Sequence, residues 1–389
     1  MLNFEFCSPT KFVFGRGTQQ EAGRLVREAG GTRALVVYGG GSVVRSGLLD
    51  QVLASLDAAG VAHVEMGGVK PNPRSDLVYE GIRLCRENGL DFLLAVGGGS
   101  VIDTAKAIGD GVPYDGDFWD FYSGKAVPQT ALPVGCVLTI PAAGSEGSNS
   151  AVITQLDGNL KRGLNVELHR PRFAIMNPEL TFTLPRYQLA CGITDMMAHI
   201  MERYFTNTPD VALTDRLAEA LLLSIIEAAP VALANSTDYE SHATLMWAGT
   251  LAHNNSVGVG REQDWASHRI GHELSAKYDC AHGASLSVLF PAWMKYTYKH
   301  DVARFVRFAT AVWGVETQGR SDEEIALAGI DALQSFFTSI GMPHTLAEVG
   351  GCEADIPTLA RSVVDGKTGH FVELYPPQIE DVLRIAAKG

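Results

Sequence analysis

The segment Phe92-Leu-Leu-Ala-Val-Gly-Gly-Gly-Ser-Val-Ile-Asp103 carries the clearest structural signal in the sequence. Its first part, residues 92–96, is a short apolar run that predicts a buried strand. The strand leads directly into a glycine turn at 97–100, and the residues that follow predict a helix over about 101–110. A strand that passes through a tight turn into a helix is typical of a parallel α/β sheet.

The same alternation extends on both sides of this segment. Apolar runs predict further strands at about 34–38, 61–66 and 136–140, and helix-like stretches lie at about 47–59 and 75–89. These strands are apolar on both faces, as expected where helices cover both sides of a sheet. We therefore predict an α/β domain with a parallel sheet over residues 1–185.

The pattern changes after Thr183-Leu184-Pro185. Apolar side chains now recur at helical spacing, for example at 217, 221 and 225, and no further strand is predicted. The predicted helices cover about 186–204, 210–228, 238–255, 263–276, 283–299, 302–313 and 322–340, with three shorter ones beyond. The sequence therefore predicts an all-helical domain over residues 186–389.

Length and charge exclude several classes of protein. A chain of 389 residues fits two domains, at about 100–200 residues each. Its 31 Lys and Arg against 44 Asp and Glu give a net charge of −13, which argues against nucleic acid or anionic membrane as a partner. No uncharged apolar run reaches the roughly 18 residues of a membrane span.

Cysteine spacing and the first residues indicate the compartment. The six cysteines include no Cys-x-x-Cys pair, which excludes a zinc ribbon and a disulfide-dense secreted fold. The start of the chain has neither a basic region nor a long apolar region, so it does not resemble a signal peptide. We therefore expect a cytoplasmic protein.

The glycine turn at 97–100 is a candidate phosphate-binding site. Glycines let the backbone approach a ligand closely, and the N–H groups at a helix N-terminus favour phosphate. The alternative is a tight turn that uses glycine for its geometry alone. The turn lacks the Gly-x-Gly-x-x-Gly spacing of the ordinary dinucleotide-binding fingerprint.

Two other loops follow predicted strands. At Gly39–Ser42, small residues stand where NAD-binding folds often carry an acidic residue, and Arg45 follows closely. Small residues leave room for a 2′-phosphate and Arg45 could pair with it, which favours NADP, although a loop that merely lacks charge is equally compatible. The loop Thr139–Glu146 is rich in small and hydroxylated residues, which suit a ligand-facing loop but are more often found in a plain connection.

Histidines cluster in the predicted helical domain. Asp195 and His199 are spaced i,i+4, as are His268 and His272, so each pair lies on one helical face. His282 follows at the start of the next predicted helix. Aspartate and imidazole suit a borderline cation such as zinc or ferrous iron. Each pair alone is more often an ordinary helix-face contact, and only both pairs together with His282 make a metal site as well supported as that alternative.

Four segments together resemble the iron-containing, or group III, alcohol dehydrogenase family. They are AVGGGSVIDTAKA at 95–107, TIPAAGSE at 139–146, GITDMMAH at 192–199 and WASHRIGHELS at 265–275. The resemblance spans essentially the whole chain and is strongest to the NADP-dependent butanol dehydrogenase and aldehyde reductase branch. It implies a dinucleotide-binding domain, an all-helical metal domain as in dehydroquinate synthase, a metal between them, and a homodimer.

The resemblance also implies roles for individual residues. The metal ligands would be Asp195, His199, His268 and His282, and His272 would lie near the nicotinamide and the substrate. The pyrophosphate turn would contain Gly98, Gly99 and Ser100, with Asp103 on the helix that it opens. Thr139 and Ser145 would lie beside the nicotinamide half, Lys161 near the ribose, and Gly40, Gly41 and Ser42 around the adenosine 2′ position.

The implied reaction is hydride transfer between NADP(H), rather than NAD(H), and a primary alcohol/aldehyde pair, with broad-range aldehyde reduction. One divalent metal, Fe²⁺ or Zn²⁺, would take part, and the ligand types suit both ions. His272 would then act as a proton relay. Two other classes stay open: a lyase like dehydroquinate synthase, and a non-catalytic metal- or nucleotide-binding protein.

Overall fold

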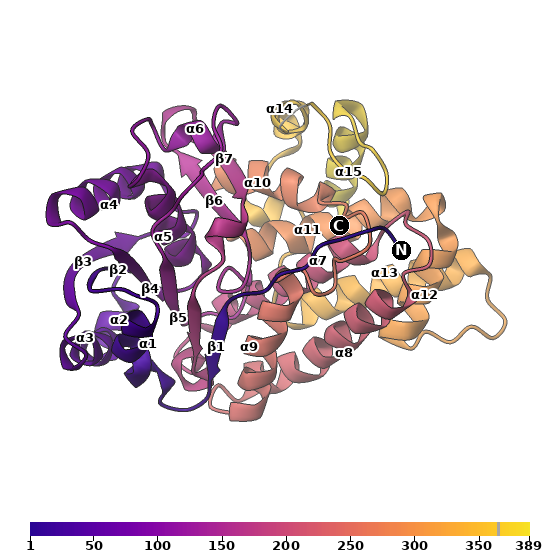
Figure 1. The fold of residues 1–389 in the computed structure, drawn as a ribbon. Coiled ribbons are helices and arrows are strands. Elements are labelled where there is room, and N and C mark those ends of the chain that lie inside the picture. Colours follow the sequence, from indigo (N-terminus) through magenta and orange to yellow (C-terminus); the bar gives the residue numbers. More distant parts are fainter. Residues whose placement is uncertain (364–365) are drawn as a thin grey trace. The chain divides into compact units, whose positions relative to one another are not determined.

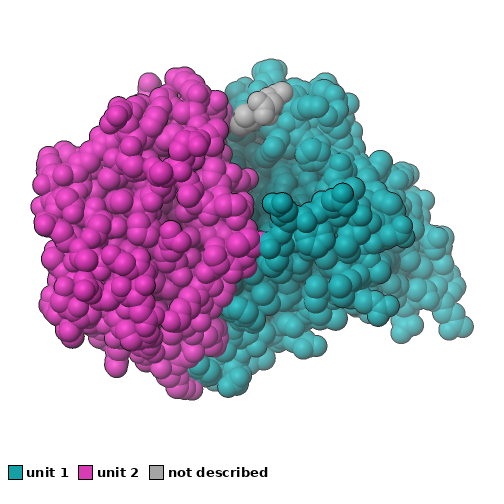
Figure 2. Space-filling model, in the orientation of Figure 1, with its two compact units in different colours: residues 1–6, 185–389 teal, residues 7–184 magenta. Residues whose placement is uncertain are grey.

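The computed structural model describes residues 1–363 and 366–389. These residues divide into two compact units, one from Cys7 to Leu184 and one from Pro185 to Gly389 that also includes Met1–Phe6 (Figure 2). The predicted domains, 1–185 and 186–389, place the first six residues in the other unit. Backbone hydrogen bonds explain the difference, because the amide of Leu2 donates to the carbonyl of Gly260 at 2.8 Å.

The unit Cys7–Leu184 is built on a six-stranded sheet in the order β1-β8-β5-β4-β2-β3 (Figure 1). Every neighbouring pair in this sheet is parallel, so the predicted parallel α/β fold is confirmed. The strands are β1 Lys11–Phe14, β2 Arg33–Gly39, β3 Ala62–Val69, β4 Phe92–Gly97, β5 Val134–Leu138 and β8 Phe173–Met176.

Strand β4 is an inner strand of this sheet, and all of its residues are buried. It pairs with β2 on one side and β5 on the other, which explains why its sequence is apolar at every position. The helices of this unit are α1 Ala22–Glu28, α2 Ser42–Arg45, α3 Leu48–Ala58, α4 Ser75–Asn88, α5 Gly99–Gly111 and α6 Trp119–Tyr122.

An antiparallel hairpin, which the sequence did not reveal, follows the sheet's fifth strand along the chain. Its strands are β6 Ser150–Gln155 and β7 Leu160–Asn165. The register pairs Thr154 with Lys161 and Ala151 with Leu164. The hairpin therefore places Lys161, on β7, beside β6, the strand that begins just after the loop at 139–149.

The second unit is helical, as predicted. Its long helices are α7 Arg186–Tyr204, α8 Ala212–Ala234, α9 Tyr239–His253, α10 Ala266–Tyr278, α11 His282–Thr297, α12 Val302–Trp313, α13 Asp322–Ser339 and α15 Pro376–Lys388, and α14 Ile356–Ser362 is short. Helix α7 is buried continuously from Leu189 to Tyr204 and packs against α8, α9 and α11. Helix α8 is the one described helix long and apolar enough, by composition alone, to cross a membrane.

Helices α7 and α11 approach each other closely at Gly283. A Cβ atom added at Gly283 would lie 2.1 Å from the carbonyl oxygen of Cys191, a contact that backbone atoms cannot relieve. The absence of a side chain at this position therefore permits the approach. It also sets the position of His282, the first residue of α11.

We expect Gly283→Ala to destabilise the protein by about 1–3 kcal/mol, the usual cost of overpacking. Chemical denaturation of the metal-free protein measures the change. Gly271→Ala on α10 is the matched control, since its Cβ would first meet the movable Oγ of Ser285 at 3.0 Å. Equal stability of the Gly283 variant and the wild type would contradict the proposed backbone contact.

Candidate metal centre and dinucleotide-binding turns

Three of the predicted metal ligands lie together in the helical unit. Asp195 on α7, His268 on α10 and His282 on α11 each offer a ligand atom, and these atoms all lie within 4.8 Å of one another. Nε2 of His268 is 3.8 Å from Oδ1 of Asp195, and Nε2 of His282 is 3.9 Å from the same oxygen. The three helices thus converge on the Asp195 carboxylate.

The chemistry of this cluster fits a divalent cation. Oδ1 of Asp195 and Nε2 of His268 are buried and have no hydrogen-bond partner among the described residues. Burial alone would raise the pKa of Asp195, but the neighbouring imidazoles of His199, His268 and His282 hold the pKa well below its ordinary value. An ionised carboxylate and a buried nitrogen without a partner are what a metal ion would satisfy.

His199 lies next to this cluster, one helical turn after Asp195. Its Nδ1 donates to the backbone carbonyl of Asp195 at 2.8 Å and lies 3.3 Å from Oδ1. Its ring centroid is 4.4 Å from that of His268. Because Nδ1 makes a backbone hydrogen bond, Nε2 is the atom that His199 would offer to a metal. Its place as the fourth ligand stays a prediction.

Glu202 holds His268 in orientation, a role that we did not assign from the sequence. Oε1 of Glu202 accepts hydrogen bonds from both the backbone N–H and Nδ1 of His268, each at 2.9 Å. The Glu202 side chain is fully buried, and its Oε2 has no hydrogen-bond partner among the described residues. A carboxylate on Nδ1 fixes the tautomer that directs Nε2 toward a metal. Its spacing, i+7 from Asp195 and i+3 from His199, could have signalled this position.

A buried arginine supports the other side of the cluster. Arg203 donates to the carbonyl of His199 at 2.8 Å and contacts Nδ1 of His253 at 3.0 Å. Its guanidinium lies 4.6 Å from the ring centre of Trp265. Burial lowers the pKa of Arg203 to about 9. These contacts hold the backbone of α7 at the turn that carries His199.

His272, the predicted proton relay, lies one helical turn after His268. Its ring centroid is 5.2 Å from that of His282, and the residue is half-buried. It therefore stands at the edge of the cluster without belonging to its innermost group. Its role stays a prediction.

The predicted pyrophosphate turn and the loop at Thr139 meet in the other unit. Helix α5 begins at Gly99, and the backbone N–H of Thr139 donates to the carbonyl of Gly97 at 3.0 Å. A Cβ added at Gly98 would lie 3.1 Å from the Ile140 side chain. The first N–H groups of a helix have no partner within it, which suits a phosphate at this turn.

The side chains of Asp103 and Ser145 form a hydrogen bond with each other. The hydroxyl of Ser145 donates to Oδ1 of Asp103 at 2.6 Å, and the backbone N–H of Val152 donates to Oδ2 at 2.9 Å. Burial raises the pKa of Asp103, although the nearby Lys106 ammonium opposes that shift. Both carboxylate oxygens therefore hold the loop and the hairpin in place. Contact of Asp103 or Ser145 with a cofactor stays a prediction.

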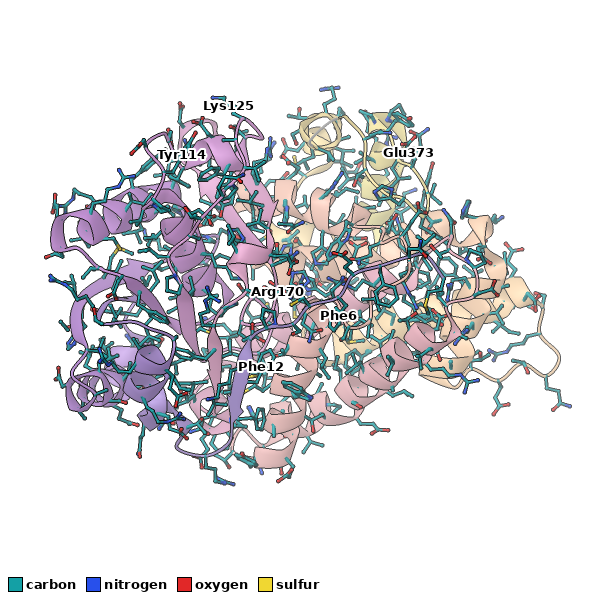
Figure 3. All side chains as sticks on the ribbon, in the orientation of Figure 1. Phe6, Phe12, Tyr114, Lys125, Arg170 and Glu373 are labelled. Atoms are coloured by element: carbon teal, nitrogen blue, oxygen red, sulfur yellow. The ribbon has the colours of Figure 1, made fainter. Side chains whose placement is uncertain are left out.

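A buried lysine, missed in the sequence, organises the same loop. The ammonium of Lys106 donates to the carbonyls of Ser145, Ser148 and Ser150 at 2.7–3.1 Å, and to the hydroxyl of Ser145 at 2.9 Å. Burial lowers its pKa to about 8. Arg170, labelled in Figure 3, donates to the carbonyl of Gly147 at 2.7 Å. Together they fix a glycine- and serine-rich loop in one conformation.

The remaining predicted cofactor residues lie on β7 and before α2. Lys161 is buried and donates to Oδ1 of Asn72 at 2.9 Å. Gly41 has a φ of 111°, and a guanidinium nitrogen of Arg45 lies 3.3 Å from the ideal Cβ position of Gly41. Gly40 and Ser42 flank this glycine. Arg45 is thus close to the loop formed by these three residues, and its predicted contact with a cofactor phosphate stays a prediction.

Comparison with known proteins covers both units. Residues 9–178 match the family described as iron-containing alcohol dehydrogenase, and residues 189–388 match the C-terminal part of the Fe-containing alcohol dehydrogenase family. A probable NADH-dependent butanol dehydrogenase of Bacillus subtilis is 44% identical over 99% of both chains. An NADPH-dependent aldehyde reductase of Escherichia coli is 39% identical over 93% of both chains.

A solved structure agrees with this assignment at the level of the fold. The crystal structure of an NADH-dependent butanol dehydrogenase A from Thermotoga maritima has a TM-score of 0.96 and 39% identity. The match covers 100% of this chain and 99% of that one. The expected family resemblance is therefore confirmed.

We expect Glu202→Gln to weaken metal binding about 10- to 100-fold, because the lost charge makes His268 a poorer ligand. The unfolding free energy of the metal-free protein should not fall, since a buried carboxylate with an unpartnered oxygen is removed. Titration with Co²⁺ or Zn²⁺ and chemical denaturation measure the two quantities. Glu240→Gln, at an exposed glutamate on α9, is the control. The variant His268→Ala, which removes a proposed ligand, should not bind the metal. An unchanged metal dissociation constant in Glu202→Gln would overturn this role.

Proposed function

Because the chain belongs to the iron-containing alcohol dehydrogenase family, we propose that its hydride transfer between a nicotinamide dinucleotide and an alcohol/aldehyde pair runs as NADPH-dependent aldehyde reduction. The observation that carries the proposal is the cluster of Asp195, His268 and His282 on three converging helices. The lyase alternative has no support in the comparisons, since the related proteins are named as dehydrogenases and a reductase.

In the proposal, Asp195, His268 and His282 hold the metal together with His199. A bound divalent metal supplies Lewis-acid chemistry toward the substrate oxygen. Glu202 and Arg203 keep two of the imidazoles in position, so the ligand geometry exists before substrate arrives. The ligand types suit Fe²⁺ and Zn²⁺ alike, and no cysteine belongs to the described cluster.

His272 is the proposed proton relay between the substrate oxygen and solvent. It is half-buried, so it can exchange protons with water while its ring remains close to His282. Imidazole has an unperturbed pKa of about 6.5, which suits proton transfer near neutral pH. The dinucleotide supplies the hydride, and the turn at Gly98–Ser100 would hold its pyrophosphate.

The preference for NADP(H) over NAD(H) is the finer part of the proposal. Small residues at Gly40, Gly41 and Ser42 leave room for a 2′-phosphate, and Arg45 supplies a nearby positive charge. The relatives differ in this respect, because one is named NADH-dependent and another NADPH-dependent. The position of Arg45 beside this loop is the observation that supports our preference for NADP(H).

Two further parts of the proposal concern the cellular location and the oligomeric state of the protein. We place the enzyme in the cytoplasm, a location supported by six cysteines without a disulfide. We also propose a homodimer with a small alcohol or aldehyde as its substrate. Nucleic acid and membrane are not proposed as partners.

An initial-rate panel tests the proposed function. Butanal should cause oxidation of NADPH, measured as loss of absorbance at the nicotinamide band, and kcat/KM should be higher with NADPH than with NADH. Arg45→Ala should lower that ratio about tenfold or more through loss of a charge-assisted contact, whereas Arg27→Ala should not. Removal of metal by a chelator should abolish turnover, and ferrous or zinc salt should restore it. No oxidation of either dinucleotide with any aldehyde would overturn the proposal.

His272→Ala should lower kcat at least about 100-fold, the typical contribution of a positioned acid–base group. Metal content, measured by elemental analysis, should stay full because His272 is not among the proposed ligands. Added imidazole should restore part of the activity. His344→Ala, at a partly exposed histidine outside the proposed site, is the control. Unchanged turnover in the His272 variant would remove this residue from the mechanism.

A further inference from the structure

Helix α8 exposes an unusually apolar outer face. This helix is long and apolar enough to cross a membrane, yet only 39% of its most apolar 18-residue stretch is buried. Leu213 is 66% exposed, Leu217 46% and Val231 47%. Figure 1 shows α8 along one edge of the helical unit, next to α9. Apolar side chains this exposed, on one face of one helix, mark an interaction surface.

The other face of the same helix is packed into its unit. Asp215 is buried and forms ion pairs with Arg261 at 2.9 Å and with Arg304 at 2.7 Å. Glu219, one turn later, accepts hydrogen bonds from Tyr204 and Arg307. A helix tied to its neighbours by buried charges cannot leave the unit to span a bilayer. A partner of the outer face must therefore bind α8 while the helix stays packed in its unit.

Exposed residues on α8, together with the half-buried Ser224, form a stripe at helical spacing. The positions 213, 217, 220, 224, 227 and 231 recur every three or four residues and so lie on one face. The stripe is apolar or small except for Glu227, and Arg216 stands at its edge. Neither Arg216 nor Glu227 forms an ion pair with another described residue. Two opposite charges thus stand on an otherwise uncharged surface.

We propose that this face binds the same face of a second copy of the chain, with the two α8 helices antiparallel about a two-fold axis near residues 221–222. This surface rests on the proposed homodimer and assigns its contact. A two-fold axis pairs positions that are equally distant from the centre. It places Leu213 near Pro230 and Val231 of the partner subunit, and Ala220 near Leu223 of the partner subunit.

The two charges on this face determine where we place the axis. Arg216 and Glu227 are 11 residues apart, about three helical turns, so both project from nearly the same side of α8. Each is 5.5 residues from the midpoint 221.5. The axis therefore brings Arg216 against Glu227 of the partner subunit, and the symmetry creates this pair twice. A helix face that complements itself in this way favours a second copy over an unrelated apolar partner.

Charge also argues against a lipid surface. The chain carries a net charge of −13, which anionic headgroups repel. Glu227 stands within the stripe, where insertion into lipid would desolvate a carboxylate without a partner. In the antiparallel pair, the same carboxylate meets a guanidinium. Small residues at 220 and 224, near the centre, let the two helices approach closely.

A charge exchange tests the surface. Sedimentation velocity over a range of protein concentrations measures the dissociation constant of the dimer. We expect Arg216→Glu alone and Glu227→Arg alone to raise it at least about tenfold, because each creates two like-charge contacts. The double variant should restore dimerisation toward the wild-type value. Arg27→Glu, the same charge change on an exposed residue of α1, should leave the dimer unchanged.

The outcomes separate this surface from the proposals on which it depends. A wild-type dimer that none of the α8 variants weakens would overturn the surface and leave the homodimer intact. A monomeric wild type with full aldehyde reductase activity would overturn both the surface and the homodimer. Flotation of the wild type with phosphatidylcholine vesicles, lost in Leu217→Asp, would assign the face to lipid instead. Hydride transfer should persist in every variant, since the outer face of α8 carries none of the proposed site residues.

Discussion

The buried carboxylate of Asp195 is the group on which the helical unit depends. Its Oδ1 lies beside three imidazoles and has no hydrogen-bond partner among the described residues. Burial of an ionised oxygen without such a partner raises the free energy of the folded protein. The surrounding helices place groups beside this oxygen that can bind a cation with it. The approach of α11 at Gly283 and the orientation of His268 by Glu202 both serve to bring nitrogen atoms to this oxygen. A cation bound here would supply the partner that this oxygen lacks.

In the α/β unit, buried charged side chains hold a loop in place. There the loop from Thr139 to Asn149 contains small residues that have little side chain of their own to pack. Lys106 fixes the conformation of this loop, because its ammonium donates to three carbonyls of the loop and the following strand. Asp103 holds the Ser145 hydroxyl and the start of the hairpin. The backbone beside the glycine turn is therefore rigid before any ligand binds.

Much of this architecture could be predicted from the sequence because its signals are local. The run at 92–96 followed by glycine predicted β4 and α5, and the predicted helix at 186–204 coincides with α7. Strands β1 and β8 have four residues each, too few to show a period, and about half of the residues in the hairpin strands are polar. Helix α8 continues to Ala234, past Pro230, whereas the sequence predicted its end at 228. Glu202 was missed because its function comes from His268, 66 residues away along the chain.

The N-terminal segment connects distant parts of the chain. Met1–Phe6 belongs to the helical unit, where the Met1 ammonium donates to Pro209 and the side chain of Met1 lies against Gly260 (Figure 3 labels Phe6 in this segment). During synthesis on the ribosome, residues 1–6 are made long before residues 209 and 260. The segment therefore has no binding site until those residues have been made, and Leu2, Phe4 and Phe6 stay 45–52% exposed even in the folded chain. The helical unit is consequently closed only after the whole α/β unit has been translated.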